Sequence, residues 1–181
     1  MELASSAEQI NILIVIDTDY VMDHNPNPSK DPANPTGIDH SSQRMICYDP
    51  RGVVSGQGTA DLNFKANPGD NVSFTGTSIY DNSDSAVIVY GIKYWSGDHV
   101  FNNFVTNLVT RNRAVMPDPS QPNGIPPTQQ KISFASYDSK VSAGGTENFY
   151  VYIAVYKLAN DGQTQELYGY FYWDPTVTVP V

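Results

Sequence analysis

Two alternating runs joined by a short Asp-Gly turn constrain the fold of this chain most strongly. Phe, Val and Ile alternate with Tyr and Ala over residues 149–156, the turn Asn160-Asp161-Gly162 follows, and residues 167–173 form the second run. Alternation with a period of two is typical of a strand with one buried face. Asp-Gly between two such runs is a strong hairpin signal. We therefore predict a β-hairpin whose tyrosine face is half-buried, with hydroxyls that reach water or a partner.

The composition extends this β pattern to the whole chain. It holds 17 Val and 12 Ile against 6 Leu, and β-branched side chains favour strands over helices. Turn formers are abundant, with 15 Asp, 15 Asn, 13 Gly and 13 Pro. We predict an all-β protein, an antiparallel β-sandwich of the jelly-roll or Ig-like type with about eight to ten strands. The expected organisation is a flexible N-terminal tail (residues 1–9) and a single β-sandwich domain (residues 10–181).

Two long segments rich in Pro and Asn are predicted as loops. Residues 23–40 have four prolines within ten positions, and residues 116–127 have five, which excludes helices and most sheet pairing. Residues 10–20, before the first loop, are predicted as a strand. Residues 100–115 fit either a helix or a strand, and their Val, Thr and Asn content favours the strand.

Charge and leader features exclude several classes of protein. The net charge is −9 and the 10 basic residues are spread thinly, which argues against a nucleic-acid surface. No apolar run approaches the ~20 residues of a membrane span. One cysteine excludes an internal disulfide framework. The first nine residues carry Glu2 and Glu8 but no Lys or Arg, unlike a secretory signal. We expect a cytoplasmic protein, whose release would need a route without such a signal.

No motif for catalysis is present. The three histidines, His24, His40 and His99, are scattered in or beside loops, and no metal-binding His spacing occurs. Cys47 lies in an apolar strand, where a cysteine is usually inert. We predict that the protein is not an enzyme. A hydrolase with paired carboxylates is the least favoured alternative, because the chain has only four Glu and no catalytic motif. The sequence does not show the spatial separation that defines such a pair.

The acidic loops offer a candidate calcium site. Ca²⁺ prefers carboxylate and carbonyl oxygens, and Asp17 and Asp19 are expected on one face at the end of the first strand, leading into the loop that contains Asp39. We predict Asp17, Asp19 and Asp39 as metal ligands. The alternative is that these residues only form turns.

Aromatic residues beside carboxylates offer a candidate ligand site. Trp95 and Asp98 follow a predicted strand, and Trp173 is followed by Asp174 in a similar segment, since residues 90–95 resemble residues 168–173. A ring can stack on an apolar ligand face while a carboxylate binds hydroxyls. We predict Trp95, Asp98 and Trp173 as ligand-binding residues, together with Asn25 and Asn27 of the first loop. The alternative is that both tryptophans belong to the core.

Several longer segments resemble the bacterial inclusion body protein family, PixA/AidA. The resemblance spans roughly residues 10 to 178 and is carried by residues 16–20, 25–28, 56–62, 90–98, 104–109 and 146–151. It implies an association with cytoplasmic inclusions and with quorum-sensing-regulated, host-associated bacteria, and it transfers no catalytic residues. The inclusion-forming type is described as methionine-rich, whereas this chain has four methionines, which favours the broader AidA-like branch.

Two functions follow as expectations. The first is a non-catalytic, lectin-like carbohydrate-binding module, assisted by calcium, in host interaction or quorum-sensing-linked physiology. The alternative is a structural or storage protein that forms cytoplasmic inclusion bodies. In either case we expect a homodimer or a higher homo-oligomer, because sandwich sheets have edges that need covering.

Overall fold

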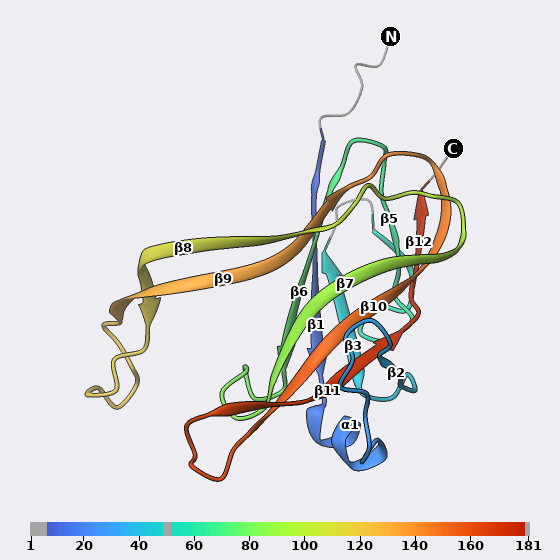
Figure 1. Cartoon of the computed structure of the whole chain (residues 1–181). Coiled ribbons are helices and arrows are strands. Elements are labelled where there is room, and N and C mark those ends of the chain that lie inside the picture. The colour runs from blue at the N-terminus through green and yellow to red at the C-terminus, as the bar shows by residue number, and fades with distance from the viewer. Residues whose placement is uncertain (1–6, 49–51, 180–181) are drawn as a thin grey trace.

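Two β-sheets pack face to face, each with an apolar face turned toward the other (Figure 1). The computed structural model describes residues 7–48 and 52–179. In this part of the chain the elements are β1 (Gln9–Ile16), α1 (Thr18–His24), β2 (Thr36–Gly37), β3 (Gln43–Tyr48), β4 (Val53–Ser55), β5 (Asn63–Lys65), β6 (Asn71–Ser78), β7 (Ala86–Gly97), β8 (Val105–Met116), β9 (Thr128–Lys140), β10 (Gly145–Leu158), β11 (Gln165–Trp173) and β12 (Thr176–Val179).

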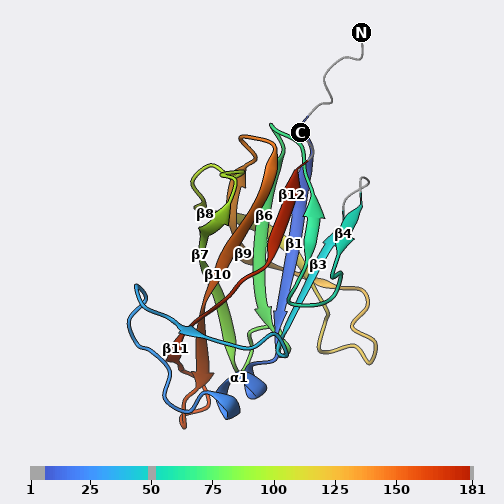
Figure 2. The same cartoon turned by 90° about the vertical axis from the view of Figure 1, so that its right-hand side faces the viewer.

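The first sheet has five strands in the order β3-β1-β6-β9-β8, and Figure 2 shows β3, β1 and β6 side by side. β1 pairs antiparallel with β3 and parallel with β6, so that Ile14 lies between Met45 and Gly76. Every second residue of β1 is buried, from Ile10 to Ile16. The parallel pair is joined by a long connection that contains α1 and β2 to β5, because parallel neighbours need a crossover.

The second sheet is organised around β10. The start of β10 pairs with β12 and its remainder with β11, while β7 pairs with its opposite side. On one side β11 pairs with β2, and on the other β12 pairs with β5, which pairs with β4. The β10–β11 pair is the predicted hairpin. Its inward residues Phe149, Val151 and Ile153 are fully buried, whereas the tyrosines between them are half-buried.

The core is closed by aromatic rings from both sheets. Phe74 of β6 meets Phe64 of β5 and Phe149 of β10 edge to face, with ring centroids 6.5 and 5.9 Å apart. All three rings are fully buried. Burial of one such side chain contributes about 1.5–3 kcal/mol, so this cluster holds the two sheets together.

A two-stranded ribbon leaves the sandwich and projects away from it (Figure 1). We call this ribbon the arm and define it as residues 105–136, which comprise all of β8, most of β9 and the loop between them. β9 pairs with β6 only from Tyr137 to Lys140, and beyond Tyr137 its sole strand partner in the described chain is β8. Among the described residues, no further strand pairs with the arm, and none of its side chains is fully buried.

The predicted strand over residues 10–20 is wrong beyond Ile16, because a short helix begins there. Asp17 caps this helix by accepting a hydrogen bond from the Tyr20 amide at 3.1 Å. Asn25 ends it, since its side-chain amide and its backbone N–H both donate to the Val21 carbonyl. These caps satisfy the backbone groups that a helix end leaves unpaired. The first loop therefore starts after His24 and includes the two-residue strand β2.

The predicted fold class is confirmed, with finer differences. The structure is a β-sandwich, and residues 105–116 form a strand. The described residues form twelve strands, and the sheets are mixed, because β1–β6, β11–β2 and β12–β5 are parallel pairs.

The ends of the chain add two observations. Residues 1–6 of the predicted tail lie outside the described residues, whereas Glu8 donates its backbone N–H to Asp70 at 3.0 Å and Gln9 begins β1. The described residues contain no helix with the length and hydropathy that crossing a bilayer requires.

Gly97 is a position where only glycine fits. It ends β7 with a φ of +88°, and a Cβ there would lie 2.2 Å from the Thr146 carbonyl oxygen. Gly58 has a similar φ of +77°, but a Cβ there would meet nothing within 4 Å. Substitutions at Gly58 and Gly97 can therefore be compared. Both carry the cost of the positive φ, but only Gly97 adds the cost of the steric clash.

We expect Gly97→Ala to lower the free energy of unfolding by roughly 3 kcal/mol, from the positive φ and from the clash together. Gly58→Ala should lower it by about 1 kcal/mol, from φ alone. Urea denaturation of both variants measures the difference. Equal losses would show that the Thr146 carbonyl does not constrain this position.

Candidate functional site

A continuous strip of aromatic rings covers the outer face of the second sheet. We define the aromatic strip as Trp95, Tyr150, Tyr172, Tyr152, Tyr90 and Tyr170. Neighbouring ring centroids lie 4.9 to 5.9 Å apart along this order. The strip crosses β7, β10 and β11, and its residues are half-buried or exposed.

Two register shifts place the β7 residues on this face. Trp95 is the extra residue where the pairing with β10 shifts between Asn148 and Phe149. Tyr90 is the extra residue where it shifts between Tyr152 and Ile153. A β-bulge redirects side chains in this way. The two similar segments, residues 90–95 and 168–173, lie on opposite sides of β10, so their tyrosines meet over it.

Packing raises the pKa of two tyrosines of the strip. Burial raises the pKa of Tyr152, and the neighbouring hydroxyls of Tyr150 and Tyr172 raise it further. Burial also raises the pKa of Tyr90, whose hydroxyl donates to the Pro32 carbonyl at 3.1 Å. The strip offers ring faces and hydroxyl groups, which suit a ligand with both apolar and polar groups.

Trp95 and Asp98 lie at one end of the strip. Trp95 has an exposed ring that a ligand could stack on, whereas the Asp98 carboxylate is hydrogen-bonded to the backbone. The Trp95 side chain is 46% exposed and stacks on Tyr150. The Asp98 carboxylate accepts the Thr146 amide at 3.0 Å, and the Asp98 amide donates to the Thr146 carbonyl at 2.8 Å. Asp98 therefore ties the β7 end to β10.

Asn25 and Asn27 belong to the loop at the opposite end of the strip. Asn25 caps α1, and its carbonyl accepts the Tyr168 hydroxyl at 2.7 Å. Asn27 is exposed. The same loop meets the strip where the Tyr170 amide donates to the Ser29 carbonyl at 2.9 Å. The structure thus separates the predicted ligand residues into two groups rather than one pocket.

The prediction of Trp173 as a ligand residue needs correction. Its side chain is 1% exposed, and its indole N–H donates to the Ala60 carbonyl at 3.2 Å. Trp173 pairs with Val151, whose side chain is buried, so the two face inward together. Trp173 is a core residue, and no ring face is open to a ligand.

The predicted calcium ligands also have other partners. Asp17 caps α1, Asp19 accepts the Tyr80 hydroxyl, and Asp39 accepts the Tyr20 hydroxyl at 3.0 Å. Asp17 follows β1 directly, but Asp19 lies in the first turn of α1, so the two are not alternate residues of an extended strand as expected. Within residues 7–48 and 52–179, no three His, Cys, Asp or Glu side chains are grouped to hold a metal ion. The calcium prediction gains no support.

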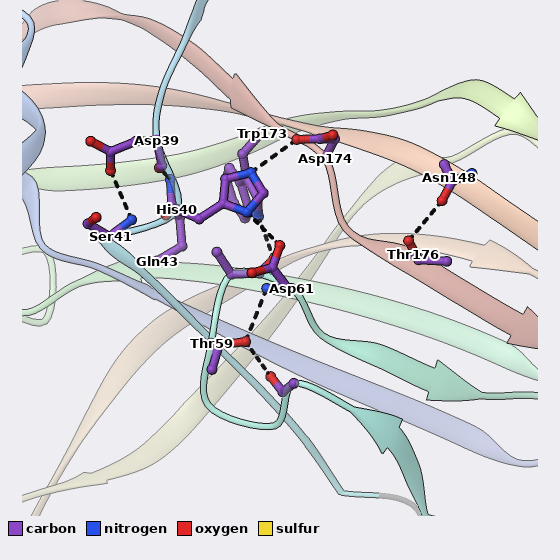
Figure 3. A network of polar contacts seen from close by, with 12 residues as sticks. Asp39, His40, Ser41, Gln43, Thr59, Asp61, Asn148, Trp173, Asp174 and Thr176 are labelled. Atoms are coloured by element: carbon purple, nitrogen blue, oxygen red, sulfur yellow. Dashed lines mark hydrogen bonds and ion pairs between the residues drawn. The ribbon is translucent and has the colours of Figure 1, made fainter.

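One polar cluster was missed by the sequence reasoning. His40 lies between two carboxylates, with Nδ1 at 2.5 Å from Asp61 and Nε2 at 3.1 Å from Asp174 (Figure 3). Burial lowers the pKa of His40, but hydrogen bonds to Asp61 and Asp174 outweigh this effect and raise the pKa above its usual value. The three residues are far apart in sequence and carry no motif, so only the fold reveals them.

Comparison with known proteins assigns the chain to a family. A family model described as PixA, inclusion body protein, matches residues 8–179. The chain belongs to the PixA family of inclusion body proteins. A crystal structure of an inclusion body protein (PixA) from Burkholderia cenocepacia J2315 is similar, with 31% identity, a TM-score of 0.84 and coverage of 99% of each chain. No curated protein matches.

In this PixA-family chain, His40 joins three segments that would otherwise be held separately. It links the loop before β3 to the turn before β5 and to the end of β11. A neutral imidazole has one N–H, whereas an imidazolium has two. Only the protonated ring can therefore donate to both carboxylates.

We expect His40→Gln in this PixA-family protein to lower the free energy of unfolding by up to ~1 kcal/mol at pH 6, since the pair is partly exposed. Because the folded pKa is raised, the stabilisation is complete below the unfolded pKa of 6.5 and is lost as pH rises through the folded pKa. Urea denaturation at pH 6 and pH 9 measures this, with the double variant His40→Gln/Asp174→Asn as the control. A loss that does not shrink at pH 9 would contradict the assignment.

Proposed function

We propose that this protein is a non-enzymatic structural protein that self-associates and accumulates as inclusion bodies in the bacterial cytoplasm. The observation that carries the proposal is the inclusion body protein match over residues 8–179. The similar crystal structure, which covers 99% of both chains, bears the same description.

Exposed apolar side chains support self-association. Tyr48, Leu108, Val115 and Ile125 are each more than 60% exposed; Tyr48 lies on β3, and the other three lie on the arm. Large apolar side chains on a surface are typical of sites that contact other proteins. With four methionines in 181 residues, the proposed role is accumulation of the protein itself rather than storage of sulfur.

Net charge should control the accumulation. At −9 the copies repel one another. Lowering the pH toward the pI of about 4.5 removes this repulsion. The proposed assembly should therefore be more extensive in mildly acid conditions.

We expect expression of the chain without a fusion partner in a bacterial cytoplasm to give dense particles that are visible by electron microscopy. These particles should dissolve in neutral buffer without denaturant and release protein with a β-type circular dichroism spectrum. Phe74→Ala is the control, because it removes a core ring and should yield aggregates that only denaturant dissolves. Protein that stays dispersed at every expression level would refute the proposal.

A carbohydrate-binding function is a second candidate, and the aromatic strip favours it. Flat aromatic faces with hydroxyl groups can stack on the apolar face of a sugar ring while binding its hydroxyls. Trp95 is the most exposed ring of the strip, and its indole N–H can donate a hydrogen bond. In this candidate function, Trp95 remains a ligand-binding residue as predicted. Asp98, Asn25 and Asn27 would lie at the ends of the site.

We expect Trp95→Ala to weaken glycan binding at least about tenfold on an array of fucosylated, mannosylated and galactosylated glycans, through loss of a stacking ring. Tyr48→Ala is the matched control, since Tyr48 is an exposed ring on the other sheet. Calcium chelation should have no effect. Absence of binding above background with the unmodified protein would remove this candidate.

A further inference from the structure

The arm is the part of the described chain that the sandwich leaves uncovered. Beyond Tyr137 the two strands pair only with each other, from Thr106↔Tyr137 to Met116↔Thr128. Almost all its residues are exposed or half-buried on both faces. A two-stranded ribbon without a covering layer is marginal in water, so docking against another surface would stabilise it.

The arm carries apolar side chains where a docking surface needs them. The pairs Val109↔Phe134 and Arg111↔Ile132 follow each other on one face of the ribbon. Phe134 is 53% exposed, and Leu108 on the opposite face is 67% exposed. In the sandwich strands, Val, Ile, Leu and Phe side chains form the core between the sheets. On the arm such side chains face solvent, beside Arg111.

Charge indicates which partner fits the arm. Residues 105–136 contain three basic residues and one acidic residue, a net charge of +2. The remainder of the chain contains seven basic and eighteen acidic residues, a net charge of −11. Two arms repel each other, whereas an arm is attracted to the body of another copy.

We propose that the arm of one copy docks on the acidic body of a second copy of this chain, so that copies join head to tail. This inference rests on the proposed self-association and specifies the surface that performs it. An arm-to-body contact is heterologous, because the two copies contribute different surfaces. After one contact, the first copy still has a free body and the second a free arm. Further copies can therefore add at both ends, unless the chain of copies closes into a ring.

Charge reversal on the arm tests the contact. We expect Arg111→Glu/Lys131→Glu to weaken self-association at least about tenfold in sedimentation velocity at low salt, and 0.5 M salt should weaken that of the unmodified protein similarly. Among residues 7–48 and 52–179, neither side chain has a hydrogen-bond partner that would confound the change, unlike Arg113, which donates to Gln129. Lys65→Glu/Lys157→Glu, on the body, makes the same change in net charge and should leave the association in place.

A trimmed arm tests the head-to-tail arrangement. Thr106 and Tyr137 face each other at the base of the arm, so an Asn-Gly turn can join them in place of residues 107–136. This trim removes Leu108, Val109 and Phe134 together with the basic residues. The trimmed copy should melt as the full chain does. It still offers a body, so adding it to the full chain should shorten the assemblies in proportion to its share.

Each outcome supports or overturns the inference. If the charge-reversed and trimmed variants associate as the unmodified protein does, the arm is not the contact, although the inclusion proposal stands. If the trimmed copy has no effect on assemblies of the full chain, the contact is arm to arm and the head-to-tail proposal fails. If the unmodified protein remains monomeric, both proposals fail. If instead the arm is required for binding to phosphatidylglycerol–phosphatidylcholine vesicles but not for self-association, the partner is a membrane.

Discussion

The alternation along β10 is the constraint on which the rest of the structure depends. Phe149, Val151 and Ile153 must face the first sheet to meet rings such as Phe74. Because successive side chains of a strand point to opposite faces, Tyr150 and Tyr152 must then face outward. The core and the aromatic strip are therefore two sides of one pattern, and a one-residue change in register would exchange them.

Sequence patterns within short segments predicted the hairpin and the loops, because alternation and turn residues determine these parts of the fold. The β10–β11 hairpin followed from alternation and an Asp-Gly turn. Proline density predicted a loop over residues 116–127, of which only Met116 belongs to a strand. Helix α1 was missed because it spans only seven residues and depends on a cap at Asp17 that can equally form a turn. The parallel β1–β6 pair joins strands separated by more than fifty residues, which no local pattern reports.

The candidate site was predicted only in part, and the two tryptophans show why. Trp95 and Trp173 end similar segments, yet one is exposed and the other buried. Trp95 occupies a β-bulge, whereas Trp173 pairs in register with Val151. Bulges arise from the pairing of two strands, so the sequence of one strand does not disclose them. The cluster of His40, Asp61 and Asp174 was missed for the same reason, because tertiary contacts alone bring it together.

The position of the single cysteine has a consequence for any dense phase that this protein forms. Cys47 is 2% exposed between the two sheets, so oxidants reach its sulfur only if the sandwich opens. Intact molecules cannot become covalently linked through disulfides while they are concentrated together. Exposure to air or peroxide therefore adds no disulfide links between folded copies.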